Sequence, residues 1–300
     1  MLDGYNFLVC GSGPITISHL KALQTIKRTK VKKIFSNNRQ KVNSLSSNFN
    51  LEILKNLNLE NIKDCNACLI TNSSEKHFEI IKKLSAVIKF FIVEKPLVEN
   101  LNEIKKLSDI VEQKNLRIFE VSQFLFFDKI YKLKSSKKVK IFVRKKRIYE
   151  DYLNYKKNKT KDKSIIFRQL PHWFDVAKKI TEEELELNQT KFRINRENLS
   201  YLHLNFLGAN SEVIIEIDLD CEKNYSTQII ADKRKILVEE NILDIISRKL
   251  NLSNRLNFTE KNLRNMYNSY LFEVNNKRHM NNFDFKKFQI FDELFKITTK

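Results

Sequence analysis

Glycine, proline and cysteine are scarce in this chain of 300 residues, which contains four glycines, three prolines and four cysteines. Glycine and proline fix unusual backbone geometry, so the few that are present mark positions where geometry matters. All three prolines lie in short patterns, namely Gly11-Ser12-Gly13-Pro14, Glu94-Lys95-Pro96 and Leu170-Pro171-His172-Trp173-Phe174-Asp175. These three segments are therefore the first candidates for a functional site.

Long apolar runs are also missing from the sequence. No run reaches the roughly 18 residues that a membrane-spanning helix needs. Residues Met1–Gly4 show no basic stretch followed by an apolar one, as a signal peptide would. We therefore expect a soluble cytoplasmic protein without a membrane span.

The cysteines predict neither a disulfide scaffold nor a metal site. Four cysteines are too few for a scaffold in a chain of this length. Cys65 and Cys68 have CxxC spacing, but no second ligand pair is spaced to complete a zinc site with them. A redox dithiol usually opens a helix, whereas Ala67–Thr71 has the pattern of a strand. We favour a reduced pair at the start of a strand.

Acidic residues are too few to balance the basic ones, and the formal net charge is +19. Such an excess can attract nucleic acid, anionic lipid or phosphorylated ligands. Basic residues concentrate between Lys132 and Lys163, but they occur together with many Asn and Ile, as in a general compositional bias. No zinc finger, RNP-like strand or basic heptad accompanies them. We favour a solvated surface over specific nucleic-acid binding.

Strand and helix patterns alternate along the first 123 residues. Apolar runs predict strands at Asn6–Cys10, Val31–Phe35, Ala67–Thr71, Lys89–Val93 and Leu116–Val121. Helical spacing predicts helices at Pro14–Ile26, Arg39–Phe49, Ser74–Leu84 with a serine cap, and Asn100–Gln113. This alternation predicts an α/β fold, with a Rossmann-type doubly wound parallel sheet over residues 1–123.

The pattern changes after residue 123. We expect helices at Phe127–Lys134, Ile165–Ile180, Leu263–Val274 and Phe285–Ile297, and a polar loop at Tyr149–Lys163. Strands are expected at Val139–Arg144, Leu202–Phe206, Glu212–Asp220, Ser226–Ala231 and Lys235–Val238. Apolar and polar residues alternate from Ile215 onward, which implies a sheet with one face exposed to solvent. Residues 124–300 therefore predict an α+β domain with an open, mostly antiparallel sheet, and an exposed sheet face of this kind favours a homo-oligomer.

The first glycine segment predicts a phosphate-binding turn. Gly11 and Gly13 stand between a strand and a helix, where backbone can approach a pyrophosphate and helix N–H groups can bind it. The third small residue of the usual pattern is replaced by Thr16. An ordinary tight turn is the alternative, and the strand–turn–helix context favours a dinucleotide contacting Gly11, Ser12, Gly13, Pro14 and Ile15.

The next residues bear on the choice between NAD and NADP. An acidic residue about 20 positions further on usually binds the adenosine ribose of NAD. Here residues 4–51 contain no acidic residue, and the position is Ser36, followed by Asn37, Asn38 and Arg39. A 2′-phosphate would meet no carboxylate there and could pair with Arg39. We therefore expect NADP(H) to be favoured, with NAD(H) as the alternative.

Three motifs in order carry a family resemblance. They are Leu8–His19 around the glycine turn, Ala67–His77 with Thr71-Asn72, and Phe91–Leu97 with Glu94-Lys95-Pro96. Together with Pro171-His172-Trp173-Phe174-Asp175, they resemble the Gfo/Idh/MocA oxidoreductases, the group of glucose–fructose oxidoreductase and inositol dehydrogenase. The resemblance implies a Rossmann domain followed by a domain with an open, mostly antiparallel sheet.

The resemblance also implies roles for individual residues. Thr71, Asn72, His77 and Glu94 would lie at the nicotinamide side of the cofactor. Lys95 would contact the substrate, with His172 and Asp175 from the family's His-x-x-Asp segment. The implied reaction is hydride transfer between nicotinamide and a sugar-like secondary alcohol. In it, Lys95 could stabilise the developing alkoxide and His172 could exchange the proton. Pro96 is expected to be cis or otherwise fixed, which would aim Lys95.

The sequence departs from the family at a position beside His172. Relatives usually have an Asp four residues before this His, and here the residue is Arg168. An added cation can bind a carboxylate or a phosphate, so we expect an anionic or nucleotide-linked sugar as substrate, bound by Lys95, Arg168, His172 and Asp175.

Three functions remain open from the sequence. The first is an active sugar oxidoreductase. The second is a catalytically degenerate family member that binds a nucleotide or a partner protein; Arg168 in place of the Asp favours it, whereas Lys95 and His172 speak against it. Taken separately, Lys95 could be an ordinary loop lysine and His172 a histidine packed beside Trp173. The third, which rests on net charge alone, is a binder of nucleic acid or an anionic surface.

Overall fold

The computed structural model describes residues 4–98, 100–144, 169–195, 198–221, 226–238, 258–276 and 284–298. The chain divides into two compact units. The first comprises Met1–Gln123 and Ile242–Phe288, and the second comprises Phe124–Asn241 and Gln289–Lys300. The sequence patterns placed everything after residue 123 in a second domain, whereas the contacts assign 242–288 to the first unit.

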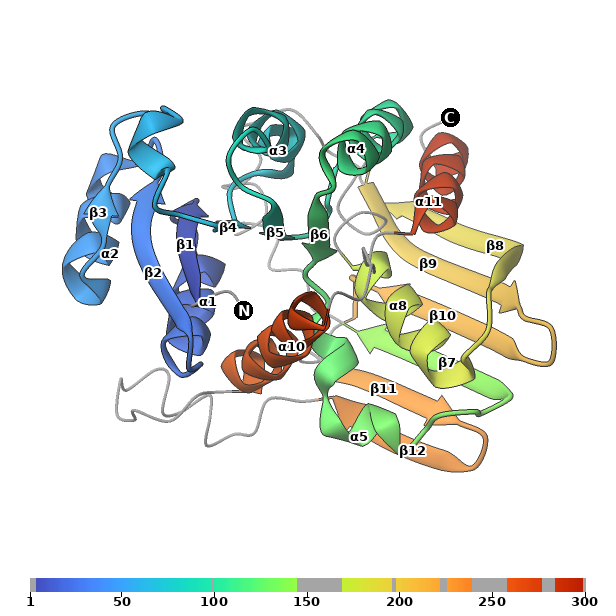
Figure 1. Cartoon of the computed structure of the whole chain (residues 1–300). Coiled ribbons are helices and arrows are strands. Elements are labelled where there is room, and N and C mark those ends of the chain that lie inside the picture. The colour runs from blue at the N-terminus through green and yellow to red at the C-terminus, as the bar shows by residue number, and fades with distance from the viewer. Residues whose placement is uncertain are drawn as a thin grey trace. The chain divides into compact units, whose positions relative to one another are not determined.

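A six-stranded sheet forms the centre of the first unit, with strand order β3-β2-β1-β4-β5-β6 (Figure 1). Every neighbouring pair in it is parallel. The strands are β1 (Tyr5–Cys10), β2 (Thr29–Phe35), β3 (Glu52–Ile53), β4 (Ala67–Ile70), β5 (Phe90–Val93) and β6 (Arg117–Glu120). The strand order reverses between β1 and β4, and open α/β sheets bind ligands at such a switch point. The predicted Rossmann-type sheet is confirmed.

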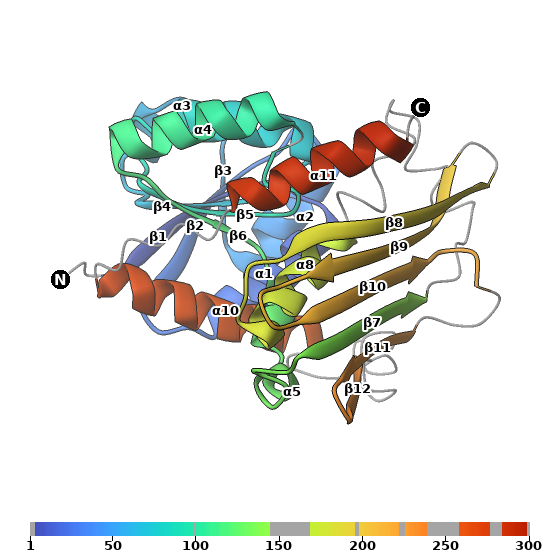
Figure 2. The same ribbon diagram turned by 90° about the vertical axis from the view of Figure 1, so that its right-hand side faces the viewer.

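The helices of the first unit lie on both faces of this sheet. Helices α3 and α4 cover one face, while α1 and α10 lie on the other side and pack against each other (Figure 2). The bounds are α1 (Pro14–Gln24), α2 (Arg39–Phe49), α3 (His77–Leu84), α4 (Leu101–Lys114) and α10 (Phe258–Asn275). The sequence predicted α10, and the structure adds that it packs on α1.

Asparagine side chains determine where two of these helices begin. The side chain of Asn38 accepts a hydrogen bond from Lys41 N at the start of α2, and Asn100 does the same for Glu103 N at the start of α4. The expected serine cap at Ser74 is wrong. Ser74–Lys76 form a 3₁₀ turn before α3, and neither this turn nor α3 has a side-chain cap. The chain enters α3 through the tighter turn, which leaves Ser74 inside it.

The core of the first unit explains its apolar strands. Strands β4 and β5 are buried at every residue, as expected for a parallel sheet covered on both faces. Cys10, Cys65 and Cys68 are buried free thiols in or next to this core. Burial raises the pKa of Cys65 to about 12. Cys68 lies at the start of β4 with Cys65 just before it, as expected, and the reduced state of the pair stays a prediction.

The second unit contains a mixed sheet with strand order β12-β11-β7-β10-β9-β8. Strands β7 and β10 are parallel, and the other neighbours are antiparallel. The strands are β7 (Lys138–Arg144), β8 (Glu186–Asn195), β9 (Asn198–Leu207), β10 (Glu212–Asp218), β11 (Ser226–Ala231) and β12 (Arg234–Val238). This agrees with the expected open, mostly antiparallel sheet.

Helices α5 (Asp128–Tyr131) and α8 (Leu170–Thr181) belong to the same unit as this sheet. Helix α5 is shorter than predicted, and α8 buries Trp173 and Phe174. The predicted loop at Tyr149–Lys163 lies outside the described residues, as does the start of the helix predicted at Ile165. Large apolar side chains on β8 and β9 are exposed, namely Phe192, Ile194 and Leu207. The expected homo-oligomer stays a prediction.

The described residues contain neither a membrane-spanning helix nor a metal-binding cluster. No helix there has the length and apolar content to cross a membrane. No cluster of three or more His, Cys, Asp or Glu side chains there has the arrangement of a metal site.

A buried ion pair attaches the first turn of α11 (Phe285–Thr298) to the sheet of the first unit. Lys287 Nζ lies 2.6 Å from Glu120 Oε2, and the two side chains are 1% and 2% exposed. The other carboxylate oxygen of Glu120 accepts a hydrogen bond from Leu97 N at 3.0 Å. The pair therefore also fixes the turn that follows β5.

We predict that Lys287→Met lowers the free energy of unfolding by about 3–5 kcal/mol, because it leaves the Glu120 carboxylate buried without this cation. Urea unfolding measures the change. The double variant Glu120→Gln with Lys287→Met should recover part of the loss, since a glutamine oxygen can still accept from Leu97 N. A loss below about 1 kcal/mol in the single variant would show that the pair contributes little.

Candidate functional site

The glycine turn after β1 has a backbone that requires glycine at its first position. Gly11 has a φ of +140°, and a Cβ there would lie 2.4 Å from Thr71 Oγ1 and 2.7 Å from Asn72 N. Thr71 in turn hydrogen-bonds Thr16 through their hydroxyls at 2.8 Å, and both residues are buried. Thr16, which replaces the usual third small residue, therefore joins α1 to the end of β4.

Gly13 differs from Gly11 because it faces open space. A Cβ at Gly13 would meet no atom within 4 Å. Gly13 is the N-cap of α1, its φ of −72° suits any residue, and Pro14 follows it as the first helical residue. No side chain caps this end of the helix. An uncapped helix N-terminus with open space beside its glycine fits a pyrophosphate.

The end of β2 lies beside this turn. Gly11 N donates to Phe35 O at 2.9 Å, and the hydroxyls of Ser36 and Ser12 are 2.8 Å apart. Asn37 and Arg39 are exposed, and Arg39 is the first residue of α2. The structure therefore brings the predicted ribose position, Ser36, into contact with the predicted phosphate turn.

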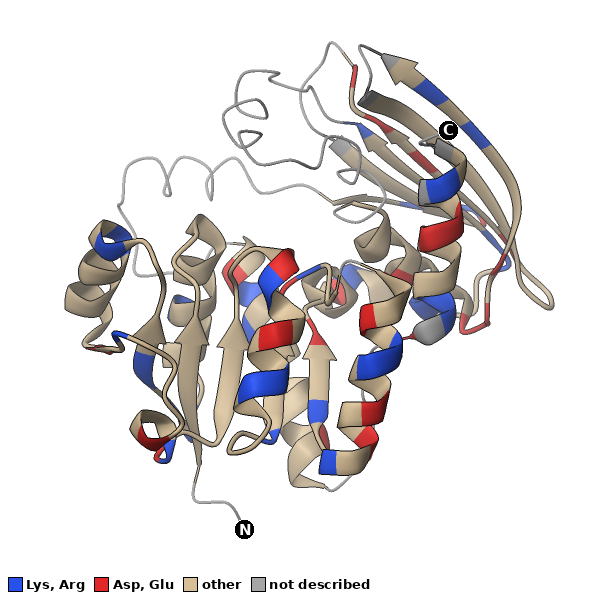
Figure 3. Cartoon of the chain, turned by 90° about the horizontal axis from the view of Figure 1, so that it is seen from above, with Lys and Arg blue, Asp and Glu red and all other residues tan. Residues whose placement is uncertain are grey.

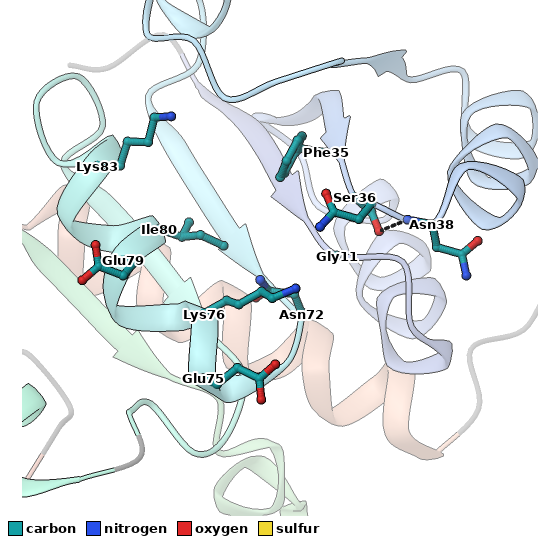
Figure 4. A pocket seen from close by; sticks show the side chains of 11 residues that line it. Gly11, Phe35, Ser36, Asn38, Asn72, Glu75, Lys76, Glu79, Ile80 and Lys83 are labelled. Atoms are coloured by element: carbon teal, nitrogen blue, oxygen red, sulfur yellow. Dashed lines mark hydrogen bonds between the residues drawn. The ribbon is translucent and has the colours of Figure 1, made fainter. Parts of the chain in front are cut away.

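A cleft of about 490 Å³ opens between the end of β2 and α3 (Figure 4). It is lined by Gly11, by Phe35, Ser36, Asn37 and Asn38 after β2, by Asn72 after β4, and by Glu75, Lys76, Glu79, Ile80 and Lys83. The side-chain oxygen Oδ1 of Asn72 is buried there without a hydrogen-bond partner among the described residues. A ligand with a donor group would satisfy this oxygen.

The turn Glu94-Lys95-Pro96 follows β5, and the peptide bond before Pro96 is cis, as expected. His77 lies behind this turn and is fully buried. Its ring nitrogens face backbone carbonyls, with Nδ1 2.9 Å from Pro96 O and Nε2 3.1 Å from Asn72 O. Burial lowers the pKa of His77, while its contacts with the carbonyls act in the opposite direction. His77 therefore joins the Asn72 and Pro96 segments through their backbones.

Glu94 makes contacts within the protein. Its Oε1 lies 2.6 Å from Nε2 of His19, and its Oε2 accepts a hydrogen bond from Lys95 N at 3.1 Å. The side chain of Glu94 is 16% exposed. Lys95 itself is partly exposed. The backbone at Lys95 and Pro96 is thus held by the partly buried Glu94 and the buried His77.

The remaining predicted site residues belong to the second unit. His172 and Asp175 lie one turn apart on α8 and are partly buried. The ring of His172 packs edge-on against Phe124, with ring centroids 5.1 Å apart. Phe124 stacks on Trp173 at 4.9 Å. Arg168 lies outside the described residues, and its role stays a prediction.

Charge on the described helices does not form a basic stripe. Lys and Arg alternate with Asp and Glu along α3 and α4 (Figure 3). In the second unit, Lys134 lies 2.6 Å from Glu182. Within the basic segment between Lys132 and Lys163, the structure describes residues only as far as Arg144. Interspersed charges of both signs are typical of a solvated surface.

Sequence reasoning missed several residues at the cleft and behind the turn. Three cleft residues, Lys76 in the 3₁₀ turn and Ile80 and Lys83 in α3, are spaced as one face of a helix, and this spacing could have identified them. His19 and Tyr267 contact each other through a 2.5 Å hydrogen bond but are 248 residues apart. No local pattern signals such a pair.

Comparison with known proteins agrees with the fold. Residues 5–122 match the family model GFO_IDH_MocA, described as "Oxidoreductase family, NAD-binding Rossmann fold". No protein with curated annotation matches the chain.

Solved structures resemble the whole chain at low sequence identity. A dehydrogenase (MviM) from Clostridium difficile is 16% identical, with a TM-score of 0.77 over 98% of this chain and 99% of the other. Scyllo-inositol dehydrogenase from Lactobacillus casei, solved with NAD(H) and scyllo-inositol, is 14% identical, with a TM-score of 0.75 and coverages of 97% and 94%.

A third structure is an oxidoreductase from Agrobacterium radiobacter in complex with NAD+, L-tartaric acid and magnesium. It is 11% identical, with a TM-score of 0.77 and coverages of 99% and 96%. At these identities the likeness establishes the fold. The family match covers the glycine turn, the Asn72 segment and the Glu94-Lys95-Pro96 turn. Residues 5–122 therefore match the Gfo/Idh/MocA family of oxidoreductases, whose model is described as an NAD-binding Rossmann fold.

Proposed function

We propose that this protein is an NAD(P)-dependent oxidoreductase that transfers hydride between nicotinamide and a sugar-like secondary alcohol. The observation that carries the proposal is the open, uncapped N-terminus of α1 at Gly13, located at the switch point of the sheet. The family match over residues 5–122 supports it. So does the similar L. casei enzyme, whose structure holds NAD(H) and scyllo-inositol.

The residues of the cleft suit a dinucleotide. We infer that the pyrophosphate binds over Gly11–Gly13, and that the adenosine enters the cleft between Phe35 and Ile80, which come from opposite walls (Figure 4). The unpartnered Oδ1 of Asn72 then accepts a hydrogen bond from the ligand. The glycine turn is supported by the hydroxyl contacts of Thr71 with Thr16 and of Ser12 with Ser36. It continues into α1 through Pro14 and Ile15.

Substitution of the two glycines separates cofactor binding from folding. We predict that Gly13→Ala leaves stability within about 1 kcal/mol of the wild type, because its φ is ordinary and its Cβ meets no protein atom. The new methyl group occupies the space assigned to phosphate, so the dissociation constant for NADH should rise at least about tenfold. NADH fluorescence and thermal unfolding give the two quantities.

Gly11→Ala is the matched control for that substitution. It introduces a clash with Thr71 and Asn72 and a strained φ, so it should destabilise the protein by at least about 2 kcal/mol. Unchanged NADH affinity in a folded Gly13→Ala protein would contradict the assigned phosphate position.

We propose a preference for NADP(H), which carries an additional phosphate at the 2′ position of the adenosine ribose. Residues 35–39 carry no carboxylate, and α2 begins there with Arg39 exposed and no acidic residue in its first turn. A 2′-phosphate would therefore meet a cation and a helix N-terminus. Glu75 and Glu79 on the opposite wall could instead bind ribose hydroxyls, which is the basis for NAD(H) as the alternative.

A comparison of dissociation constants tests this preference. We expect NADPH to bind more tightly than NADH, and Ser36→Asp to reverse the order by adding a carboxylate at the ribose position. Isothermal titration of both nucleotides with both proteins measures it. Tighter binding of NADH by the wild type would refute the preference and leave the dinucleotide site itself standing.

Oxidation of a secondary alcohol removes a hydride from carbon and a proton from oxygen. A bound nicotinamide supplies the hydride acceptor. We propose that Lys95 holds the hydroxyl oxygen and stabilises its negative charge, and that His172 accepts the proton. These two roles rest on the family resemblance of the two motifs, since Lys95 belongs to the first unit and His172 to the second.

We also propose that the substrate is anionic, such as a sugar acid or a nucleotide-linked sugar. Arg168, Asp175, Lys95 and His172 would hold it. The formal charge of +19 favours anionic ligands in general. The similar A. radiobacter oxidoreductase was solved with L-tartaric acid, a dicarboxylic acid with secondary hydroxyls.

Turnover is tested with a panel that pairs neutral sugars and inositols with sugar acids and nucleotide sugars. We expect NAD(P)+ reduction with an anionic member, and a loss of kcat of at least about a hundredfold in Lys95→Met and in His172→Ala. Arg168→Ala should raise the KM for the anionic substrate. NADH affinity serves as the control and should stay unchanged in all three variants. If nucleotide binds but nothing in the panel reacts, the catalytically degenerate, nucleotide-binding function is favoured instead.

A further inference from the structure

Two buried side chains and the partly buried Glu94, from separate elements of the first unit, form a hydrogen-bonded chain that ends at Lys95. The hydroxyl of Tyr267, on α10, lies 2.5 Å from Nδ1 of His19, on α1. Nε2 of His19 lies 2.6 Å from Oε1 of Glu94, and the other oxygen of Glu94 accepts from Lys95 N at 3.1 Å. His19 and Tyr267 are fully buried.

The chemistry of Tyr267, His19 and Glu94 determines which atom donates and which accepts in each of these hydrogen bonds. Burial, and to a smaller extent the charge of Glu94, raises the pKa of Tyr267 well above its ordinary value. Tyr267 therefore keeps its proton and can donate it to Nδ1 of His19. A neutral imidazole has one N–H and one acceptor nitrogen. His19 then carries its proton on Nε2 and donates it to the Glu94 carboxylate, so every donor in the chain meets an acceptor.

We propose that Tyr267 and His19 are positioning residues for Lys95, which act by holding the Glu94 carboxylate against the backbone N–H of Lys95. The Lys95 side chain begins at the carbon bonded to that nitrogen, so the chain sets where the lysine leaves the turn. Displacements of about 1 Å at a reacting group can lower rates by about a hundredfold. The role of Lys95 in turnover rests on the proposed function, whereas the geometry of the chain does not.

Helix α10 also supplies a matched control. Tyr270 lies one turn after Tyr267 and is 3% exposed. Its hydroxyl donates a hydrogen bond to the backbone carbonyl of Glu120 at 3.1 Å. Tyr267→Phe and Tyr270→Phe each remove one buried tyrosine hydroxyl from the same helix. Only the first of these hydroxyls belongs to the chain that ends at Lys95.

The first test reads the proton on His19 by nitrogen NMR of the full protein, without any substrate. In the wild type we expect the neutral form protonated on Nε2. In Glu94→Gln the Lys95 N–H still needs the side-chain oxygen, so the amide NH₂ faces His19, and the proton should move to Nδ1. A wild-type His19 protonated on Nδ1, or on both nitrogens, would overturn the proposed direction. So would a tautomer that does not change in Glu94→Gln.

The second test measures hydrogen exchange of the Lys95 amide. We expect exchange to be at least about tenfold faster in Tyr267→Phe and within about twofold of wild type in Tyr270→Phe. Equal acceleration in both variants would mean that general packing of α10 protects the amide, and this would overturn the positioning role. No acceleration in either would do the same. If Tyr267→Phe does not fold, His19→Phe provides the comparison, because it removes the group that holds the Glu94 carboxylate and should accelerate exchange of the Lys95 amide in the same way.

The third readout connects the chain to turnover. With the substrate panel, Tyr267→Phe should lower kcat at least about tenfold while the KM for the nucleotide and its dissociation constant stay unchanged. Tyr270→Phe should change none of the three. Equal loss of kcat in both variants contradicts the proposal. If the wild type oxidises no alcohol, the proposed function fails, and the tautomer and exchange measurements still decide whether the chain positions Lys95.

Discussion

Parallel pairing of β1, β4 and β5 places the three sequence motifs at one edge of the sheet, and the rest of the candidate site depends on this pairing. Backbone hydrogen bonds continue past the strand ends, from Thr71 N to Cys10 O at 2.8 Å and from Glu94 N to Ile70 O at 2.9 Å. The glycine turn, the Asn72 segment and the Glu94-Lys95-Pro96 turn therefore begin side by side. Open α/β sheets bind their ligands at this edge.

Buried and partly buried polar groups then hold in place the turns that the strands bring together. His77 connects the Asn72 and Pro96 segments, Glu120 binds Leu97 N, and Glu94 binds Lys95 N. Two of these groups are themselves held from a distant part of the sequence, Glu120 by Lys287 and Glu94 through His19 by Tyr267. The C-terminal segment of the first unit thus supports the turn that the N-terminal sheet forms.

Much of the fold could be predicted because local patterns carry it. Fully apolar β4 and β5, the helical spacing of α4 and the glycine turn all act within a few residues. Strand β8 was missed because it is a largely exposed edge strand paired only with β9 in the described sheet, so its polar sequence lacks a buried face. Positions such as Gly11, Ser36 and Lys95 were predictable from motifs. The contact of His19 with Tyr267 was not, because it depends on packing between α1 and α10 across most of the chain.

The most direct measurement for the central claim is to map where a nicotinamide dinucleotide binds, by recording amide NMR shifts of the full protein as NAD+ or NADP+ is added. We expect the largest changes at Gly11, Gly13, Ser36 and Asn72. Shifts confined to the strands of the second unit, or no shifts at millimolar nucleotide, would contradict it.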